Sequence, residues 1–583
     1  MVRFIYILLF TLLTTSSNSQ QIYKRHWGTL YPTKTTTWPN KLTIPPRIDT
    51  SRYRNYSMVY SLNKASNKLY VLEDLQALPK VHNTNVTIYE FNESNNQIKN
   101  ITTNLTYASQ ILHDKSNNMY IIGKLNNGAS GLFKCDTNGN TTFITNVLGD
   151  PTKSSVTFDH YGNIYTLGSA YKTTVLSPSF FQSTGDQNSI LNLQDVISKY
   201  DSKGKHIWST FYFNNQSHIW GIAAGTNGLY VYGHEFLTTS NSSYFGTANG
   251  HQPKATGIYS NGDPNSAKNV FLSKFNFDGT RAWSTYYGTQ QSMVPMQTTV
   301  AANKSMEVIG DDIYIITDHI LPQGINNKLN TANVAINTTP DITNAKTLTK
   351  FSGDGKRIWA SYLYDAETLN ITTDDNIMLS GTNILLNNLP LGTLDAYQKS
   401  LKGTEDNITY IISNNGSNLN YLSYYGDYLR ENGIAVPSKN GYYILGGTTD
   451  YPSRSSTLNT ANAKYTKLEK IDTYYNPYKY VGNFVGFFTK TLSNENHELT
   501  TDFTKHIKIY PNPTTDVLTI DSNILLSYDS KIIIYDLSGK KIMDQKITDQ
   551  YKNTINVGHL PTNVYILEIG NESERYQTKI IKK

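Results

Sequence analysis

The sequence predicts an all-β protein: a seven-bladed β-propeller of four-stranded blades, followed by a small Ig-like β-sandwich. Aromatic residues make up 12% of the 583 residues and charged residues only 16%. Tyr, Thr, Ile and Val on a background rich in Asn, Ser and Gly favour strands joined by turns. Two short patterns also recur through the middle of the chain, and a different pattern of short alternating segments begins near residue 507. So many aromatic residues exclude a disordered chain.

Residues 1–19 are predicted to be a secretory signal peptide. Arg3 supplies a positive charge, residues 4–13 form an apolar run too short to span a bilayer, and Ser17 and Ser19 are small residues at the −3 and −1 positions of a cleavage site. No Cys follows the apolar run, so we expect no lipid anchor. No other apolar run approaches 18 residues, so we expect no transmembrane segment in the mature chain.

Internal repeats organise residues 20–490. The first pattern is a turn followed by an apolar residue, Tyr and another apolar residue, and its copies centre on Tyr70, Tyr120, Tyr165, Tyr230, Tyr314, Met378 and Tyr443. The second pattern is an alternating hairpin, seen best at 197–212, 272–288 and 348–364, whose turn contains a Gly able to take positive φ. A further short strand precedes each first pattern. Seven four-stranded units predict a propeller.

The N-terminal strand is expected to close the ring. HWGTLY (26–31) matches HIWSTFY and AWSTYY, with Trp27 standing where Trp208 and Trp283 stand. We therefore expect 26–31 to be the outer strand of the last blade, which would remove an open sheet edge. The competing segment is NHELTTDF near residue 500.

The repeats resemble a known family. VFLSKFNFDGTRAWSTYYG, GTLDAYQKSLKGTEDNITYIIS, LSYYGDYLRENGIAV and SKNGYYILGGTTD are similar to the SBBP family of β-propeller repeats. The resemblance covers most of residues 25–490, but the units around Leu132 and Asp318 depart from it. It implies a propeller and no particular reaction.

Residues 507–583 read as short alternating strands, which predict a small β-sandwich. They resemble the type A C-terminal sorting domain of the type IX secretion system of Bacteroidetes. The residues that carry this resemblance are Tyr510, Pro511, Asn512, Pro513, Tyr535, Asp536, Gly539, Leu560, Pro561 and Tyr565. It implies contact with the type IX machinery, export via the periplasm, cleavage in the 491–506 linker, and release or attachment at the outer cell surface.

Charge, cysteine and motifs limit the possible chemistry. The net charge is only +6 with no dense basic run, so we expect no nucleic-acid partner. Cys135 is alone, which excludes a disulfide-stapled fold. We expect no metal and no cofactor, because P-loop and dinucleotide fingerprints are missing and His234-Glu235 lacks the second His of a zinc protease. Turns such as 136–140 contain Asp, Asn and Gly, which also occur in calcium-binding loops, but hairpin turns favour the same residues.

Binding is expected where the units differ. Trp208, Trp283 and Trp359 recur in equivalent positions, which predicts packing between blades. Short turns should gather on one face of the propeller, and long loops such as 235–269 and 288–308 on the other, where binding is usual. The candidate binding residues on this long-loop face are His218, Trp220, His234, Tyr244 and His251.

The predicted function is a secreted or surface-displayed binding or adhesion module for an extracellular ligand, either glycan or protein, with no catalytic residue assigned. One alternative is an extracellular hydrolase or lyase acting on polysaccharide or protein, and another is a structural component of the cell surface. A carboxylate pair about 5–10 Å apart on the long-loop face would favour a glycosidase. A flat, aromatic face with few acids would favour binding.

Overall fold

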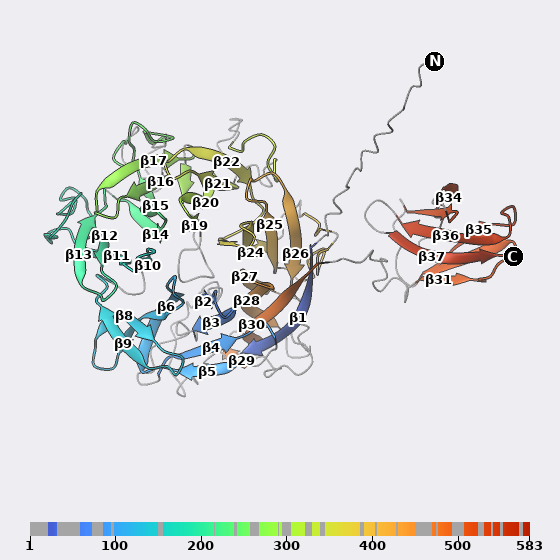
Figure 1. The fold of residues 1–583 in the computed structure, drawn as a ribbon, viewed down its shortest axis with the longest axis horizontal. Coiled ribbons are helices and arrows are strands. Elements are labelled where there is room, and N and C mark those ends of the chain that lie inside the picture. The colour runs from blue at the N-terminus through green and yellow to red at the C-terminus, as the bar shows by residue number, and fades with distance from the viewer. Residues whose placement is uncertain are drawn as a thin grey trace, which may run out of the picture. The chain divides into compact units, whose positions relative to one another are not determined.

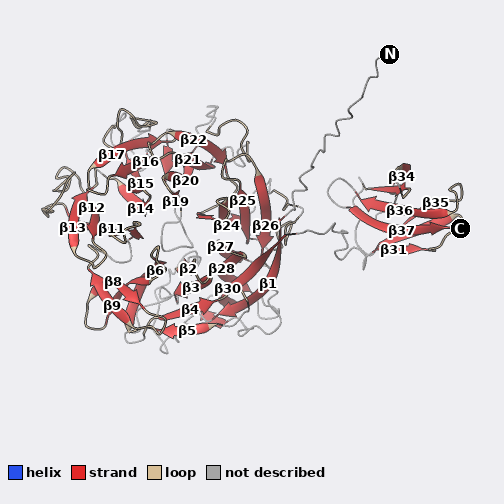
Figure 2. Cartoon of the chain, in the orientation of Figure 1, coloured by secondary structure: helices blue, strands red, loops and turns tan. Residues whose placement is uncertain are grey.

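The protein, seen in a computed structural model, folds into strands and turns, with no helix among the described residues (Figure 2). It divides into two compact units, one formed by Tyr23–Lys490 and one that contains Thr491–Lys583. The structure describes residues 21–31, 59–72, 85–94, 98–149, 155–214, 216–237, 242–256, 268–289, 291–293, 305–320, 329–337, 344–384, 390–393, 395–402, 405–426, 430–450, 469–473, 476–492, 507–522, 530–537, 540–548, 552–570 and 575–583. The predicted signal peptide and most of the 491–506 linker lie outside these ranges.

Four-stranded antiparallel sheets repeat through the first unit, and their strands pair in chain order. The first two sheets contain β2 (Tyr60–Asn63), β3 (Lys68–Leu72), β4 (Thr87–Phe91) and β5 (Lys99–Thr102), then β6 (Leu105–His113), β7 (Met119–Leu125), β8 (Ser130–Cys135) and β9 (Thr141–Thr145). The next two contain β10 (Ser155–Phe158), β11 (Ile164–Tyr171), β12 (Leu193–Tyr200) and β13 (His206–Phe211), then β14 (His218–Ala224), β15 (Leu229–Phe236), β16 (Lys268–Phe275) and β17 (Arg281–Tyr287).

The following sheet has one additional strand. β18 (Gln291–Met293), β20 (Asp312–Ile320), β21 (Asn344–Phe351) and β22 (Arg357–Tyr362) pair in this order, and β19 (Met306–Ile309) also pairs with β20.

The last sheet of the first unit has nine strands and contains two antiparallel runs. One run is β23 (Thr368–Ile371), β24 (Ile377–Ile384), β25 (Glu405–Ile412) and β26 (Leu419–Tyr425). The other is β27 (Arg430–Ser438), β28 (Gly441–Asp450), β30 (Asn476–Leu492) and β1 (Gln21–Tyr31), with β29 (Glu469–Thr473) also paired to β30. A single parallel pair, Glu405 with Arg430, joins the two runs.

The N-terminal strand β1 is the outermost strand of its run and is hydrogen-bonded beside β30. In Figure 1 the blue β1 lies along the orange β30, although more than 400 residues separate them in the chain. The competing segment near residue 500 lies outside the described residues.

The sheets follow one another around a ring in chain order (Figure 1). An all-β ring of four-stranded antiparallel sheets is a β-propeller, so the predicted fold class is confirmed. The count of seven blades stays a prediction.

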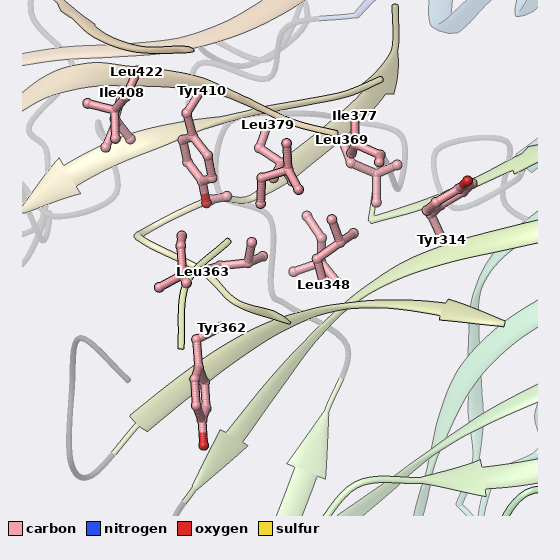
Figure 3. Packing of buried hydrophobic residues seen from close by; sticks show 14 of the residues in the cluster. Tyr314, Leu348, Tyr362, Leu363, Leu369, Ile377, Leu379, Ile408, Tyr410 and Leu422 are labelled. Atoms are coloured by element: carbon pink, nitrogen blue, oxygen red, sulfur yellow. The ribbon is translucent and has the colours of Figure 1, made fainter. Parts of the chain in front are cut away.

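Apolar side chains fill the spaces between neighbouring sheets. Tyr314 and Leu348 of one sheet pack against Leu379 and Tyr410 of the next, and all four are fully buried (Figure 3). Full burial of a side chain of this size contributes about 1.5–3 kcal/mol. Much of the aromatic content of the sequence therefore belongs to the core.

The repeated tryptophans join each outer strand to the next sheet. Their indole Nε1–H groups donate to backbone carbonyls in the last turn of the following sheet: Trp27 to Glu93 (3.1 Å), Trp208 to Phe277 (3.2 Å), Trp283 to Gly353 (2.9 Å) and Trp359 to Asn414 (3.2 Å). These residues pack between sheets, as predicted, and do not form a stacking surface for a ligand.

The long 235–269 loop does not lie wholly on the long-loop face, so that expectation is wrong for residues 242–256. They run along the outer strand β17, where Tyr286 N–H donates to Gln252 O (2.9 Å) and Thr247 N–H donates to Ser284 O (2.8 Å). Equivalent bonds fasten Gln182 to β13, Ile336 to β22 and Gln398 to β26. The physical reason is that an outer strand has unpaired backbone groups, which these segments satisfy.

The C-terminal unit contains two antiparallel sheets around one core. One sheet has β31 (Ile507–Tyr510), β32 (Val517–Ser522) and β35 (Lys552–Asn556). The other has β34 (Lys541–Lys546), β33 (Lys531–Tyr535), β36 (Asn563–Gly570) and β37 (Arg575–Lys582). Leu518, Ile534 and Leu567 are fully buried in the shared core. The Ig-like classification stays a prediction.

Candidate functional site

Three of the five candidate binding residues meet at the long-loop end of β14 and β15. His218 on β14 pairs directly with His234 on β15, and their ring centroids lie 6.4 Å apart. Trp220 lies at a register shift of β14, with its ring centroid 5.8 Å from that of His234. A bulge of this kind re-aims the side chain that it contains.

These three side chains differ in their access to solvent. Trp220 is 37% exposed and His218 is exposed, whereas His234 is only 4% exposed. Burial, with smaller effects from Lys268 and His218, lowers the pKa of His234 to about 3. The His234 ring is therefore neutral at physiological pH.

An aromatic ring and a cation complete the cluster. The Phe236 ring centroid lies 5.2 Å from that of His234, and the Lys268 ammonium lies 4.6 Å from the centre of the Phe236 ring. We call His218, Trp220, His234, Phe236 and Lys268 the β14–β15 group. It combines a partly exposed indole, two imidazoles, an aromatic ring and a positive charge on the neighbouring strands β14, β15 and β16.

Tyr244 and His251 lie apart from this group, on the 242–256 segment that is hydrogen-bonded along β17. The Tyr244 hydroxyl donates to Gln182 Oε1 (2.5 Å), and Arg281 Nη1 donates to Tyr244 O (2.7 Å). The His251 ring lies 6.3 Å from that of Tyr287, centroid to centroid. Both residues therefore contribute to packing along an outer strand.

Glu235, next to His234, faces the opposite side of its strand. Its carboxylate accepts hydrogen bonds from Tyr286 Oη (2.6 Å), Asn214 Nδ2 (2.6 Å) and Ser242 Oγ (3.1 Å). Burial raises the pKa of Glu235, and these hydrogen bonds oppose the rise. The Glu235 carboxylate therefore fastens the 242–256 segment to the sheet. His234 and Glu235, although adjacent in the sequence, do not contribute to the same site.

A second polar cluster, which sequence reasoning missed, lies at the long-loop end of β20 and β21. Lys346 Nζ is 3.1 Å from Asp365 Oδ1 and 3.8 Å from Asp318 Oδ1. Burial raises the pKa of Asp318, partly offset by Lys346. Burial alone would lower the pKa of Lys346. The nearby carboxylates, Asp318 and Asp365 first, outweigh this effect, so the net shift of the Lys346 pKa is upward. The sequence carries no spacing signal for this cluster, because Asp318 and Lys346 come together only through the register of β20 and β21.

Among the described residues, no group of three or more His, Cys, Asp or Glu side chains could hold a metal ion. No helix with the length and apolarity needed to cross a membrane occurs in the described part of the chain.

One exposed part of the C-terminal motif is the end of β31 and the turn after it. Tyr510, Pro511, Asn512 and Pro513 are all exposed. The Asn512 side chain donates to Lys579 O (2.9 Å) and accepts from Ile581 N–H (2.8 Å). Asn512 thereby fixes this turn to β37 of the other sheet.

The other motif residues support the fold of this unit. Asp536 accepts the Lys540 N–H (3.0 Å) across a turn, and Tyr535 donates to Glu568 Oε1 (3.4 Å). Leu560 is buried, and the Tyr565 hydroxyl donates to Pro561 O (2.9 Å). Gly539 lies outside the described residues.

Residues 508–583 match the secretion system C-terminal sorting domain. The predicted sorting domain is therefore confirmed. It marks the chain for export by the type IX secretion machinery, so the protein is secreted or displayed on the outer cell surface.

Similar solved structures are distant from this chain. A gluconolactonase from Xanthomonas campestris is 10% identical, with 56% of this chain and 82% of that chain covered at a TM-score of 0.29. The quinohemoprotein alcohol dehydrogenase ADHIIG from Pseudomonas putida HK5 is 8% identical, with 87% and 80% covered at 0.32. No curated protein matches the chain in sequence. Likenesses this weak support no inference about activity.

Proposed function

We propose that the protein is an exported, surface-displayed binding module whose ligand stacks on Trp220. The exposed indole of Trp220, whose ring centroid lies 5.8 Å from that of His234 on the neighbouring strand, is the observation that supports this proposal. We further propose that, once the signal peptide (1–19) has been removed, the chain consists of a propeller (20–490), a linker (491–506) and the sorting domain (507–583).

A glycan is the ligand class that this surface suits best. A sugar ring has an apolar face that can lie on an indole, and its hydroxyl groups can hydrogen-bond to an imidazole such as that of His218. The ammonium of Lys268 adds positive charge at the edge of the group, which favours an anionic polysaccharide. A protein ligand remains the competing outcome of the experiment.

The test is a glycan array probed with the full chain and with Trp220→Ala. A stacking tryptophan that acts as a binding hot spot contributes about 2 kcal/mol or more, so we expect affinity for the bound glycan to fall about thirtyfold. Tyr161→Ala is the matched control, because Tyr161 is an aromatic residue 71% exposed in a short turn on the other face. Equal binding by wild type and Trp220→Ala, or an equal loss in the control, would refute the proposal.

The carboxylate cluster supports a second candidate function, an extracellular glycosidase. Asp318 and Asp365 each lie within 4 Å of Lys346 Nζ, so their carboxylate oxygens are less than about 7 Å apart, a separation compatible with a catalytic pair. The burial that raises the pKa of Asp318 suits a general acid. The ion pair with Lys346 fits a purely structural role equally well.

Release of reducing ends from bound polysaccharide distinguishes these two roles. For a glycosidase we expect wild type to release them and Asp318→Asn to lower the rate at least about a hundredfold. Asp201→Asn, in an exposed turn of the other face, should keep the wild-type rate. If wild type releases no reducing ends, the second candidate is rejected.

A further inference from the structure

His218 and His234 are positioned as a cross-strand pair of metal-binding side chains. They lie directly opposite each other on antiparallel strands, and side chains in this relation project from the same face with Cβ atoms about 4.5–5.5 Å apart. Two imidazoles on one tetrahedral ion, each with a bond of about 2.1 Å, have ring centres roughly 5 Å apart. The observed separation is 6.4 Å with the two rings at 90°, so binding one ion requires the exposed His218 side chain to rotate toward His234.

The buried member of the pair lacks a partner. Nδ1 of His234 is buried and has no hydrogen-bond partner among the described residues, and the side chain is only 4% exposed. An unsatisfied buried polar atom typically costs about 1–3 kcal/mol. A bound ligand at this place would remove that penalty.

A nearby positive charge limits the affinity of this place for a cation. The Lys268 ammonium lies 4.6 Å from the centre of the Phe236 ring, and the Phe236 ring centroid is 5.2 Å from that of His234.

We propose that His218 and His234 form a two-histidine site for a first-row transition-metal ion, Cu²⁺ or Zn²⁺, with water completing the coordination. Imidazole ligands suit these ions, with Cu²⁺ bound more tightly, whereas Ca²⁺ and Mg²⁺ require oxygen ligands. No third His, Cys, Asp or Glu joins the pair within the described ranges, so the remaining positions stay open to exchangeable ligands. This site goes beyond the glycan-binding proposal and does not depend on it.

The experiment uses the full chain titrated with CuCl₂ or ZnCl₂ alone. We expect one equivalent to bind and the Cu²⁺ electron paramagnetic resonance spectrum to show two coordinating nitrogens. Copper should also quench tryptophan fluorescence, and Trp220→Phe should remove most of the quenched signal, because the Trp220 and His234 ring centroids are 5.8 Å apart.

Variants decide whether this pair is the site. His218→Ala should bind metal at least about tenfold more weakly, and because His218 is exposed, the variant should keep the wild-type melting temperature without metal. His251→Ala is the matched control, with an exposed His on another segment, and should bind like wild type. Absence of binding by wild type, or equal affinity in wild type and His218→Ala, overturns the proposal. Glycan binding is measured in a separate experiment, so the metal-site proposal and the glycan-binding proposal can each be rejected without the other.

Discussion

Replacing Trp27 with Ala is expected to lower the free energy of unfolding by about 3–5 kcal/mol, the usual effect of truncating a buried aromatic residue. Trp27 lies on β1 and is only 3% exposed. Its ring stacks near Phe91 and Phe487, with centroids 6.3 Å away in both cases. Its Nε1–H donates to Glu93 O (3.1 Å), so one side chain joins the N-terminal strand, the last sheet and the first sheet.

The same junction explains why the effect should be large. Glu93 of the first sheet accepts hydrogen bonds from Ser438 Oγ (2.5 Å) and Asn440 Nδ2 (2.6 Å) of the last sheet. The Tyr443 hydroxyl donates to Asn67 O (2.7 Å) across the same junction. Domains are typically stable by only about 5–15 kcal/mol, so loosening this junction removes a large share of the total.

Urea denaturation followed by far-UV circular dichroism measures the loss, with Trp220→Ala as the matched control. Trp220 is also a strand tryptophan but is 37% exposed, and we expect its replacement to change stability by less than about 1 kcal/mol. Similar losses in both variants would show that β1 does not hold the ring closed. This control also shows that any binding defect of Trp220→Ala is not a folding defect.

The fold could be predicted because the repeats are local. Each hairpin has its own alternation and turn, and the recurrence of Trp208, Trp283 and Trp359 indicates packing between units, which their indole hydrogen bonds confirm. The match of residues 26–31 to internal outer strands pointed to β1, because a missing strand at one end of a ring must come from elsewhere in the chain.

The site was harder to predict, because it depends on which strands the connecting loops contact in the folded chain. Tyr244 and His251 are in the loop that begins just after His234 and the end of β15, but the edge of β17 holds their segment through backbone bonds that carry no sequence signature. Asp318 and Lys346 pair across strands separated by a long loop, and Asp365 joins them from the next connection. No motif spacing relates these three residues. Only the register of the folded strands brings them together.

Replacing Gly416 with Ala is the second change with a large expected effect. Gly416 has φ of 76°, and a Cβ there would lie 2.6–2.8 Å from ring carbons of Trp359. Trp359 cannot move away easily, because it is 6% exposed and donates its indole N–H to Asn414 O (3.2 Å) in the same turn. A left-handed backbone costs about 1–2 kcal/mol for a residue with a Cβ, and overpacking adds about 1–3 kcal/mol. We expect a loss of about 2–5 kcal/mol.

Two further variants separate these contributions. Gly128 also has positive φ (91°), but a Cβ there would meet nothing within 4 Å, so Gly128→Ala should show the backbone contribution alone. In a Trp359→Ala background the ring carbons that the new methyl group would meet are removed, so Gly416→Ala should there lose only about as much as Gly128→Ala. The difference is a coupling energy between two residues in contact. Strictly additive losses in urea denaturation would mean that glycine is required at 416 by backbone conformation alone, and that the tryptophan of the preceding sheet imposes no steric demand on this turn.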